Sequence, residues 1–306
     1  MAGFTNVPYN TSNETSLLLK TLRTAWWERE LQPQSWKKIF EIKKADQAVE
    51  YELEMQSAGL GSLKAEGARS SITSAGEGFK TAYKINTYSS TIYYTLESIQ
   101  DNLYKKEWGP QSMGFAEAQD VLRNIVVYSL FNFATSQISA AGDGLSLLNT
   151  QHKNAFSTYT NTFTTPAQLS LSTLNQITQM IQLSTNFSGY PIEASPKRLL
   201  TSVQNSQTAQ YLLFSPQDPT TANRAINPMF HGGYFADGLM TTSYLTDPQA
   251  YFAQSTVSHG FTFYERVPFT IQELPQSDSL TYGFIGFERF SRSYSTPRCV
   301  AGCTFF

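Results

Sequence analysis

Charge is distributed unevenly along this chain, and the asymmetry limits what the chain can fold into. Residues 1–110 carry 13 Lys/Arg and 13 Asp/Glu, whereas the remaining 196 residues carry only 9 and 11. A soluble domain usually has about 25% charged residues. Because an isolated protein keeps charge on its surface for solubility, we expect a body this rich in aromatic and uncharged polar residues to be covered by copies of itself.

Composition excludes several classes of protein. The net charge is −2 and the pI about 6.0, so no overall basic field is available to hold nucleic acid. No apolar run approaches the roughly 20 residues of a membrane helix, and the N-terminus lacks the pattern of a signal peptide. We therefore expect a soluble protein made in a cytosol, with no membrane contact.

Neither a metal nor a cofactor is predicted. Cys299 and Cys303 are the two cysteines, and the three histidines show no ligand spacing relative to them. Two reduced thiols are the favoured interpretation, and a disulfide between subunits is the alternative.

Residues 1–33 are predicted to form an N-terminal arm. The start is polar, an amphipathic stretch follows, and Pro33 closes it. Trp26 and Trp27 are adjacent, so both cannot face inward from one narrow helical stripe. One of them is predicted to contact another subunit, and burial against its own domain is the alternative.

The next segment has the pattern of a long β-hairpin. Val49–Met55 alternates apolar and acidic residues, which is typical of a strand with one face in water. Phe79–Tyr94 is β-rich again, and the residues between are polar and contain several glycines. We predict a two-stranded hairpin over residues 50–92 with a flexible, charged tip, a disordered surface loop being the alternative. The charged residues predicted to contact a neighbouring subunit are Lys64, Glu66, Arg69 and Glu77.

Apolar residues at three- and four-residue spacing predict a helix over residues 113–141. Pro110 and Ser112 precede it and Gly142 follows it. At 1.5 Å per residue it would span about 40 Å. A spine for a flat subunit and an ordinary core helix are both compatible with this pattern.

Three further elements are predicted downstream. Pro166 is expected to open a helix, Arg198–Val203 to form a short buried strand, and Ser206–Phe214 to form the next helix.

No motif predicts an enzyme. The sequence has no phosphate-binding loop, nucleophile elbow or zinc-protease motif. Asp143, His152 and a serine could be combined into a triad, but no spacing supports one. The C-terminal region holds four arginines among aromatics, for which pairing with carboxylates of other subunits is favoured over binding a nucleic-acid backbone. These arginines are Arg266, Arg289, Arg292 and Arg298.

Six short segments occur in a characteristic order: Ala140–His152, Ser195–Leu200, Ile226–Pro228, Tyr244–Phe252, His259–Arg266 and Phe287–Tyr294. In order and spacing they resemble the major capsid protein of tailed bacteriophages, the Hong Kong 97 fold, and are similar to the Mu-like major head subunits. With the arm, hairpin and long helix, the resemblance covers nearly the whole chain.

The resemblance implies an α+β fold and a subunit that assembles into pentamers and hexamers of an icosahedral shell around double-stranded DNA. It implies this organisation: N-terminal arm 1–33; peripheral domain 34–49 and 93–142, with the spine helix 113–141; extended loop 50–92; axial domain 143–255; and return strands of the peripheral domain 256–306.

The resemblance also implies partners and a location. The location would be the virion, after assembly in the host cytoplasm. The expected partners are copies of the same chain, a scaffolding protein, a maturation protease, portal and decoration proteins, and weakly held packaged DNA. No long scaffolding domain precedes the arm, so we expect any scaffold to be a separate chain.

Some relatives of this kind crosslink a Lys to an Asn, but nothing in the sequence identifies a partner for Lys64. We therefore predict no covalent crosslink. Two other functions stay open: another phage structural protein of the tail or baseplate, and a module that binds carbohydrate or a cell surface.

Overall fold

The computed structural model describes residues 34–95, 104–137, 141–218, 225–257, 260–274 and 281–305, with positions 20, 23, 24 and 97; for residues 104–112 it describes the backbone alone. The predicted arm, with Trp26 and Trp27, lies outside the described residues apart from three isolated positions. The elements are η1 (Ser35–Lys38), β1 (Glu41–Lys44), β2 (Val49–Gln56), β3 (Gly76–Lys84), β4 (Asn86–Thr95), α3 (Tyr104–Asn132), β5 (His152–Lys153), β6 (Thr158–Tyr159), α4 (Leu171–Gln182), β7 (Pro196–Ser202), α5 (Ser206–Phe214), α6 (Pro228–His231), β8 (Leu239–Thr242), β9 (Tyr251–Ser255), β10 (Phe261–Leu274), β11 (Thr281–Tyr294), η3 (Pro297–Cys299) and β12 (Val300–Cys303).

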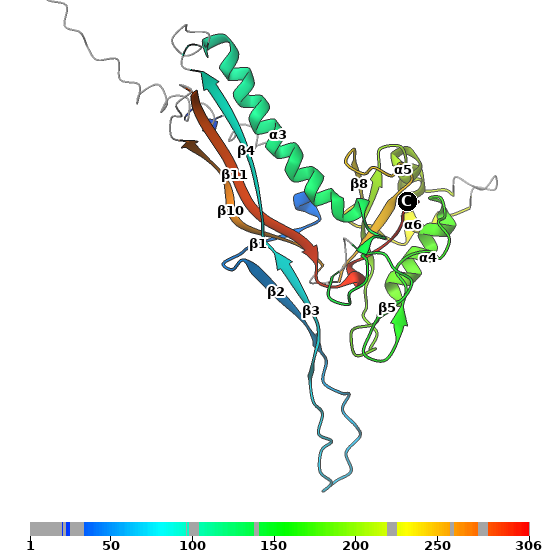
Figure 1. Ribbon diagram of the computed structural model, residues 1–306. Coiled ribbons are helices and arrows are strands. Elements are labelled where there is room, and N and C mark those ends of the chain that lie inside the picture. Colours follow the sequence, from blue (N-terminus) through cyan, green and yellow to red (C-terminus); the bar gives the residue numbers. More distant parts are fainter. Residues whose placement is uncertain are drawn as a thin grey trace, which may run out of the picture.

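Two four-stranded sheets organise the chain. The first has the order β1-β10-β11-β4, with the long helix α3 running beside it (Figure 1), and we call this unit the first body. The second sheet has the order β12-β9-β7-β8. We call this sheet, its helices and the connecting residues from 143 to 255 the second body. The β2–β3 hairpin projects away from both bodies.

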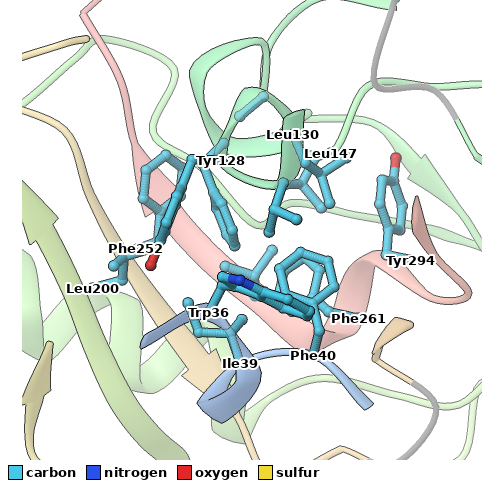
Figure 2. Packing of buried hydrophobic residues seen from close by; sticks show 14 of the residues in the cluster. Trp36, Ile39, Phe40, Tyr128, Leu130, Leu147, Leu200, Phe252, Phe261 and Tyr294 are labelled. Carbon is cyan, nitrogen blue, oxygen red and sulfur yellow. The ribbon is translucent and has the colours of Figure 1, made fainter. Parts of the chain in front are cut away.

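The sheet of the second body is buried on both faces. Successive side chains of a strand point to opposite faces of the sheet, and neighbouring residues of β7 enter different apolar clusters. Leu199 belongs to the apolar cluster under α4 and α5, whereas the next residue, Leu200, belongs to the other large cluster. The cluster that contains Leu200 includes residues of both bodies and so joins them. Figure 2 shows Trp36 and Phe40 packed among side chains of α3 and of both sheets, including Phe252 of β9. The apolar core is therefore continuous across the bodies.

The predicted hairpin is present, but it is shorter than predicted. β2 pairs with β3 in antiparallel register from Val49 opposite Lys84 to Gln56 opposite Gly76. Residues 86–95 form β4, which pairs with β11 along its whole length. The prediction that the hairpin extends to residue 92 is thus wrong, because β4 finds its partner nearly 200 residues away in the chain.

The long helix is also displaced from its predicted position. It occupies Tyr104–Asn132 rather than 113–141, and its 29 residues span about 43 Å. Pro110 lies within its early turns, where a proline removes one hydrogen bond without ending the helix. At the other end the Asn132 amide donates to the Tyr244 carbonyl and accepts from the Thr246 N–H, which fixes the chain there as it turns away.

Three more predictions are tested downstream. The helix at Ser206–Phe214 and the strand near Arg198 are confirmed. The helix expected from Pro166 begins at Leu171, because Ser170 and Thr173 form a reciprocal capping box there. β12 pairs with β9, so the last strand of residues 256–306 belongs to the second body and not to the peripheral sheet as predicted.

Candidate functional site at the base of the hairpin

In β2 the apolar side chains face water and the acidic side chains face the body, the opposite of the usual arrangement in a half-buried strand. Tyr51, Leu53 and Met55 are 55%, 40% and 64% exposed, whereas the intervening Glu52 and Glu54 turn toward the body. Lys80 Nζ lies 3.9 Å from the centroid of the Tyr51 ring, and Leu53 and Met55 remain substantially exposed to water. Farther out, the tip exposes more large apolar side chains, namely Leu60, Leu63 and Ile72.

Glu52 is the centre of a hydrogen-bond cluster that joins the hairpin to the first body. Its Oε1 accepts from Lys43 Nζ and from the Tyr264 hydroxyl, each at 2.8 Å. Its Oε2 accepts from the Tyr83 hydroxyl at 2.9 Å and from Ser295. Burial alone would raise the pKa of Glu52, but the hydrogen bonds from Lys43, Tyr264 and Tyr83 hold it below its ordinary value.

Glu54 joins the hairpin to the second body through Arg298. The Arg298 guanidinium donates from Nη1 to Glu54 and from Nη2 to the Asn154 side-chain oxygen. Its side chain is 3% exposed and that of Glu54 is 20% exposed. Burial raises the pKa of Glu54, and the positive charge of Arg298 offsets this in part. One buried arginine thus links β2 to the residues after β5.

A cavity of about 540 Å³ lies beside these two glutamates. Its lining combines charged groups, Lys43 and Arg298 among them, with apolar side chains from both the hairpin and the second body. Next to these polar contacts, Tyr83 of β3 packs against Tyr264 in a small buried apolar cluster, with ring centroids 4.9 Å apart.

Asp143 and His152, which the sequence left without a role, form a buried pair. The His152 Nδ1 atom lies 2.6 Å from Asp143 Oδ2, and Nε2 lies 3.3 Å from the Leu147 carbonyl oxygen. In a catalytic triad the histidine Nε2 would contact a serine hydroxyl, whereas here it faces the Leu147 backbone carbonyl. The pair closes the connection between α3 and β5, and Tyr159 stacks on the imidazole at a centroid distance of 5.3 Å.

The predicted contact residues fall into two groups. Lys64, Glu66, Arg69 and Glu77 are all exposed on the distal hairpin. Arg292 instead donates to the Val126 carbonyl and to Ser129 of α3, and Arg298 is buried at the hairpin base. Arg266 and Arg289 are half-buried on the first sheet. Arg266 and Arg289 lie on the neighbouring strands β10 and β11, where Arg289 pairs with Val267.

Sequence reasoning missed the Glu52 and Glu54 clusters. The signal was the acidic residues at every second position of β2, a pattern that predicts one face in water without showing which face it is. Among the described residues, no group of three or more His, Cys, Asp or Glu side chains could hold a metal ion. No helix in the described part of the chain is both long and apolar enough to span a membrane. Cys299 and Cys303 are both free thiols and both buried.

No protein-family model and no curated protein sequence matches the chain. Solved structures do match over nearly its whole length. The virus-like particle from Pyrococcus furiosus has a TM-score of 0.52 at 11% identity and covers 93% of this chain and 98% of its own. A structure from Microbacterium phage Oxtober96 has a TM-score of 0.56 at 10% identity, over 90% and 93% of the two chains. The capsid of Myoviridae phage XM1 has a TM-score of 0.53 at 9% identity, over 87% and 90%.

These similarities establish the fold. The chain has the α+β capsid fold of the Hong Kong 97 type, which the resemblance in the sequence predicted.

Proposed function

We propose that this chain is the major capsid protein of a tailed bacteriophage or a related particle. Copies of it would assemble into pentamers and hexamers and close an icosahedral shell around double-stranded DNA. The observation that carries the proposal is the solvent-exposed apolar face of β2, on a hairpin that projects from a body with a capsid fold.

The apolar face is the contact we assign to a second copy. Tyr51, Leu53 and Met55 lie at every second position, so they form one continuous strip along the ribbon. Burying such a strip contributes roughly 25 cal/mol for each Å² of apolar surface removed from water. Many modest contacts of this kind, summed over a closed lattice, make a stable shell while single misplaced subunits can still leave.

Charged residues of the distal hairpin add specificity to this contact. Lys64, Glu66, Arg69 and Glu77 are exposed and alternate in sign, so they can pair across a subunit boundary and fix the register. The arm of residues 1–33, with Trp26 and Trp27, would supply a second contact. Arg292 and Arg298 have partners in their own chain, so we assign them to the subunit and not to its boundary.

The domain assignment follows the same proposal. The first body would be the peripheral domain with α3 as its spine, and the second body would be the axial domain around the five- and six-fold centres. The protein would reside in the virion and act as a structural component without catalysis. A separate scaffold, a maturation protease, portal and decoration proteins, and weakly bound DNA would be its partners.

Negative-stain electron microscopy of the purified, overexpressed protein tests this function. Shells, tubes or ring-shaped capsomers are the expected result. Small particles of a single size, the mass of one chain, would overturn the proposal. The same images would overturn it in favour of a tail or baseplate protein if they showed only open fibres or discs.

A further inference from the structure

The base of the hairpin is attached to the second body by a short loop as well as by Arg298. This loop, residues 186–188, connects α4 to β7. The Asn186 side-chain amide donates to the Ser57 hydroxyl at 3.0 Å, and the Ser188 hydroxyl donates to the Ser57 carbonyl at 3.3 Å. Beside them Phe187 meets Phe79 of β3 edge to face, with ring centroids 5.2 Å apart. Both strands of the hairpin are therefore held.

The same part of the hairpin is attached to the first body through Glu52. The base thus lies between the two bodies, with the cavity of about 540 Å³ among the contacts. A two-stranded ribbon is marginal by itself and bends easily. Its direction is consequently decided by its contacts with the two bodies, which include the packing of Tyr83 of β3 against Tyr264, rather than by its own stiffness.

The contacts to the second body have the longer lever arm. Glu52 lies near the middle of β2, whereas Ser57 lies just beyond its end and Phe79 lies on the opposite strand. Contacts farther along a ribbon restrict its angle more strongly than contacts at its root.

We propose that Phe187 and Arg298 are positioning residues that set the direction of the hairpin relative to the second body. A rotation of the second body then carries the hairpin with it. The orientation of the second body therefore sets the direction in which the hairpin of the same subunit projects. The consequence for assembly rests on the proposed function, since a hairpin held in one direction loses less freedom when it meets a second copy.

Distances between spin labels in unassembled subunits test this directly. One label is placed at Glu77 on the hairpin and one at Gln182 at the end of α4, both through introduced cysteines at exposed positions. The native thiols are buried and do not compete for the label. In the otherwise unchanged protein we expect a single narrow distance distribution.

The variants separate the two attachments. Phe187→Ala removes the aromatic contact at a half-buried position, and Glu54→Gln removes the charge that Arg298 pairs with. Each should widen the distribution by about twofold or shift its centre, because local contacts of this size set local opening. Phe156→Ala is the matched control, since Phe156 is an exposed phenylalanine of the second body, 82% accessible. It should leave the distribution unchanged.

Distributions with the width and the centre of the parent in both variants would overturn the inference. The proposed function fails by a different result, namely the absence of particles from the unmodified protein. Folding is monitored by circular dichroism. If Glu54→Gln unfolds the subunit, the Phe187→Ala distribution alone decides, because that residue lies outside the two apolar core clusters.

Discussion

Lys43 of β1 donates from Nζ to Glu52 Oε1 of β2 across 2.8 Å. The Glu52 carboxylate of the hairpin therefore finds its partner in its own chain and not in a neighbour. With the acidic face turned inward, the apolar face of the same strand is left for another molecule. This arrangement, more than the charge content of the segment, explains why the hairpin is suited to assembly.

Replacing Glu52 with Gln should destabilise the subunit by about 1–2 kcal/mol near neutral pH, because it removes charge-assisted hydrogen bonds from Lys43 and two tyrosines. The pKa of Glu52 is lowered in the folded state, so its stabilising effect is present above its unfolded pKa of about 4.3 and disappears as pH falls through the lower folded value. Thermal unfolding against pH should show the two proteins differing above the unfolded pKa and converging as pH falls below it, where the folded carboxylate becomes protonated. Glu66→Gln at the exposed tip is the control and should match the parent throughout. Parallel curves for the parent and Glu52→Gln would contradict this assignment.

Placing a charge on the apolar face of β2 should prevent assembly without unfolding the chain. Met55 is 64% exposed, so Met55→Asp removes little buried surface in the single subunit, whereas in a shell it would bury an unpaired carboxylate. We expect an unchanged melting temperature and an association constant at least tenfold lower per contact, about 1.4 kcal/mol, seen as a smaller assembled fraction by sedimentation. Met55→Leu, which keeps the apolar surface, should assemble normally. Equal assembly of Met55→Asp and the parent would remove β2 from the interface.

Removing the distal hairpin should leave a folded subunit that does not close shells. Glu77 is paired with Met55 and should stay. Deleting Leu60–Ser74 with a short glycine turn preserves β2 and β3. Circular dichroism should be unchanged and electron microscopy should show no closed particles. Normal particles from this deletion would show that the tip contacts nothing essential.

Arg123 of α3 and Glu288 of β11 form a buried ion pair, with an Nε to Oε2 distance of 3.0 Å and side chains 4% and 2% exposed. Arg123→Met alone should cost about 3–5 kcal/mol, because it leaves a buried carboxylate without its counter-charge. The double variant Arg123→Met with Glu288→Met should recover most of that loss. Urea unfolding measures both. If the loss of stability in the double variant equals the sum of the losses in Arg123→Met and Glu288→Met, the pair does not couple the helix to the sheet.

Particles of this protein should contain no covalent crosslinks. Lys64 lies exposed on the distal hairpin, and no catalytic carboxylate was identified that could activate it. Denatured particles analysed by mass after boiling with reductant should give the mass of one chain. A ladder of oligomers that resists this treatment would contradict the prediction.

Much of the fold was predictable from the sequence because its signals are local. The alternation in β2, the strand near Arg198 and the helix at Ser206–Phe214 depend on neighbours within a few residues. The position of α3 was not predictable in this way, since Asn132 is fixed by a chain segment more than 100 residues downstream.

The candidate site was less predictable, because its contacts are distant in sequence. Tyr264 lies 212 positions from Glu52 and Arg298 lies 244 positions from Glu54. A pattern of period two shows that a strand has two faces but not which face meets the body. The same long-range pairing explains why β4 was assigned to the hairpin instead of to β11.

Cryo-electron microscopy of the assembled, unmodified protein tests the central claim most directly. The account predicts closed shells in which the face formed by Tyr51, Leu53 and Met55 is covered by a second copy of the chain. Protein that stays as single chains at high concentration, or shells in which this face is exposed to solvent, would contradict it.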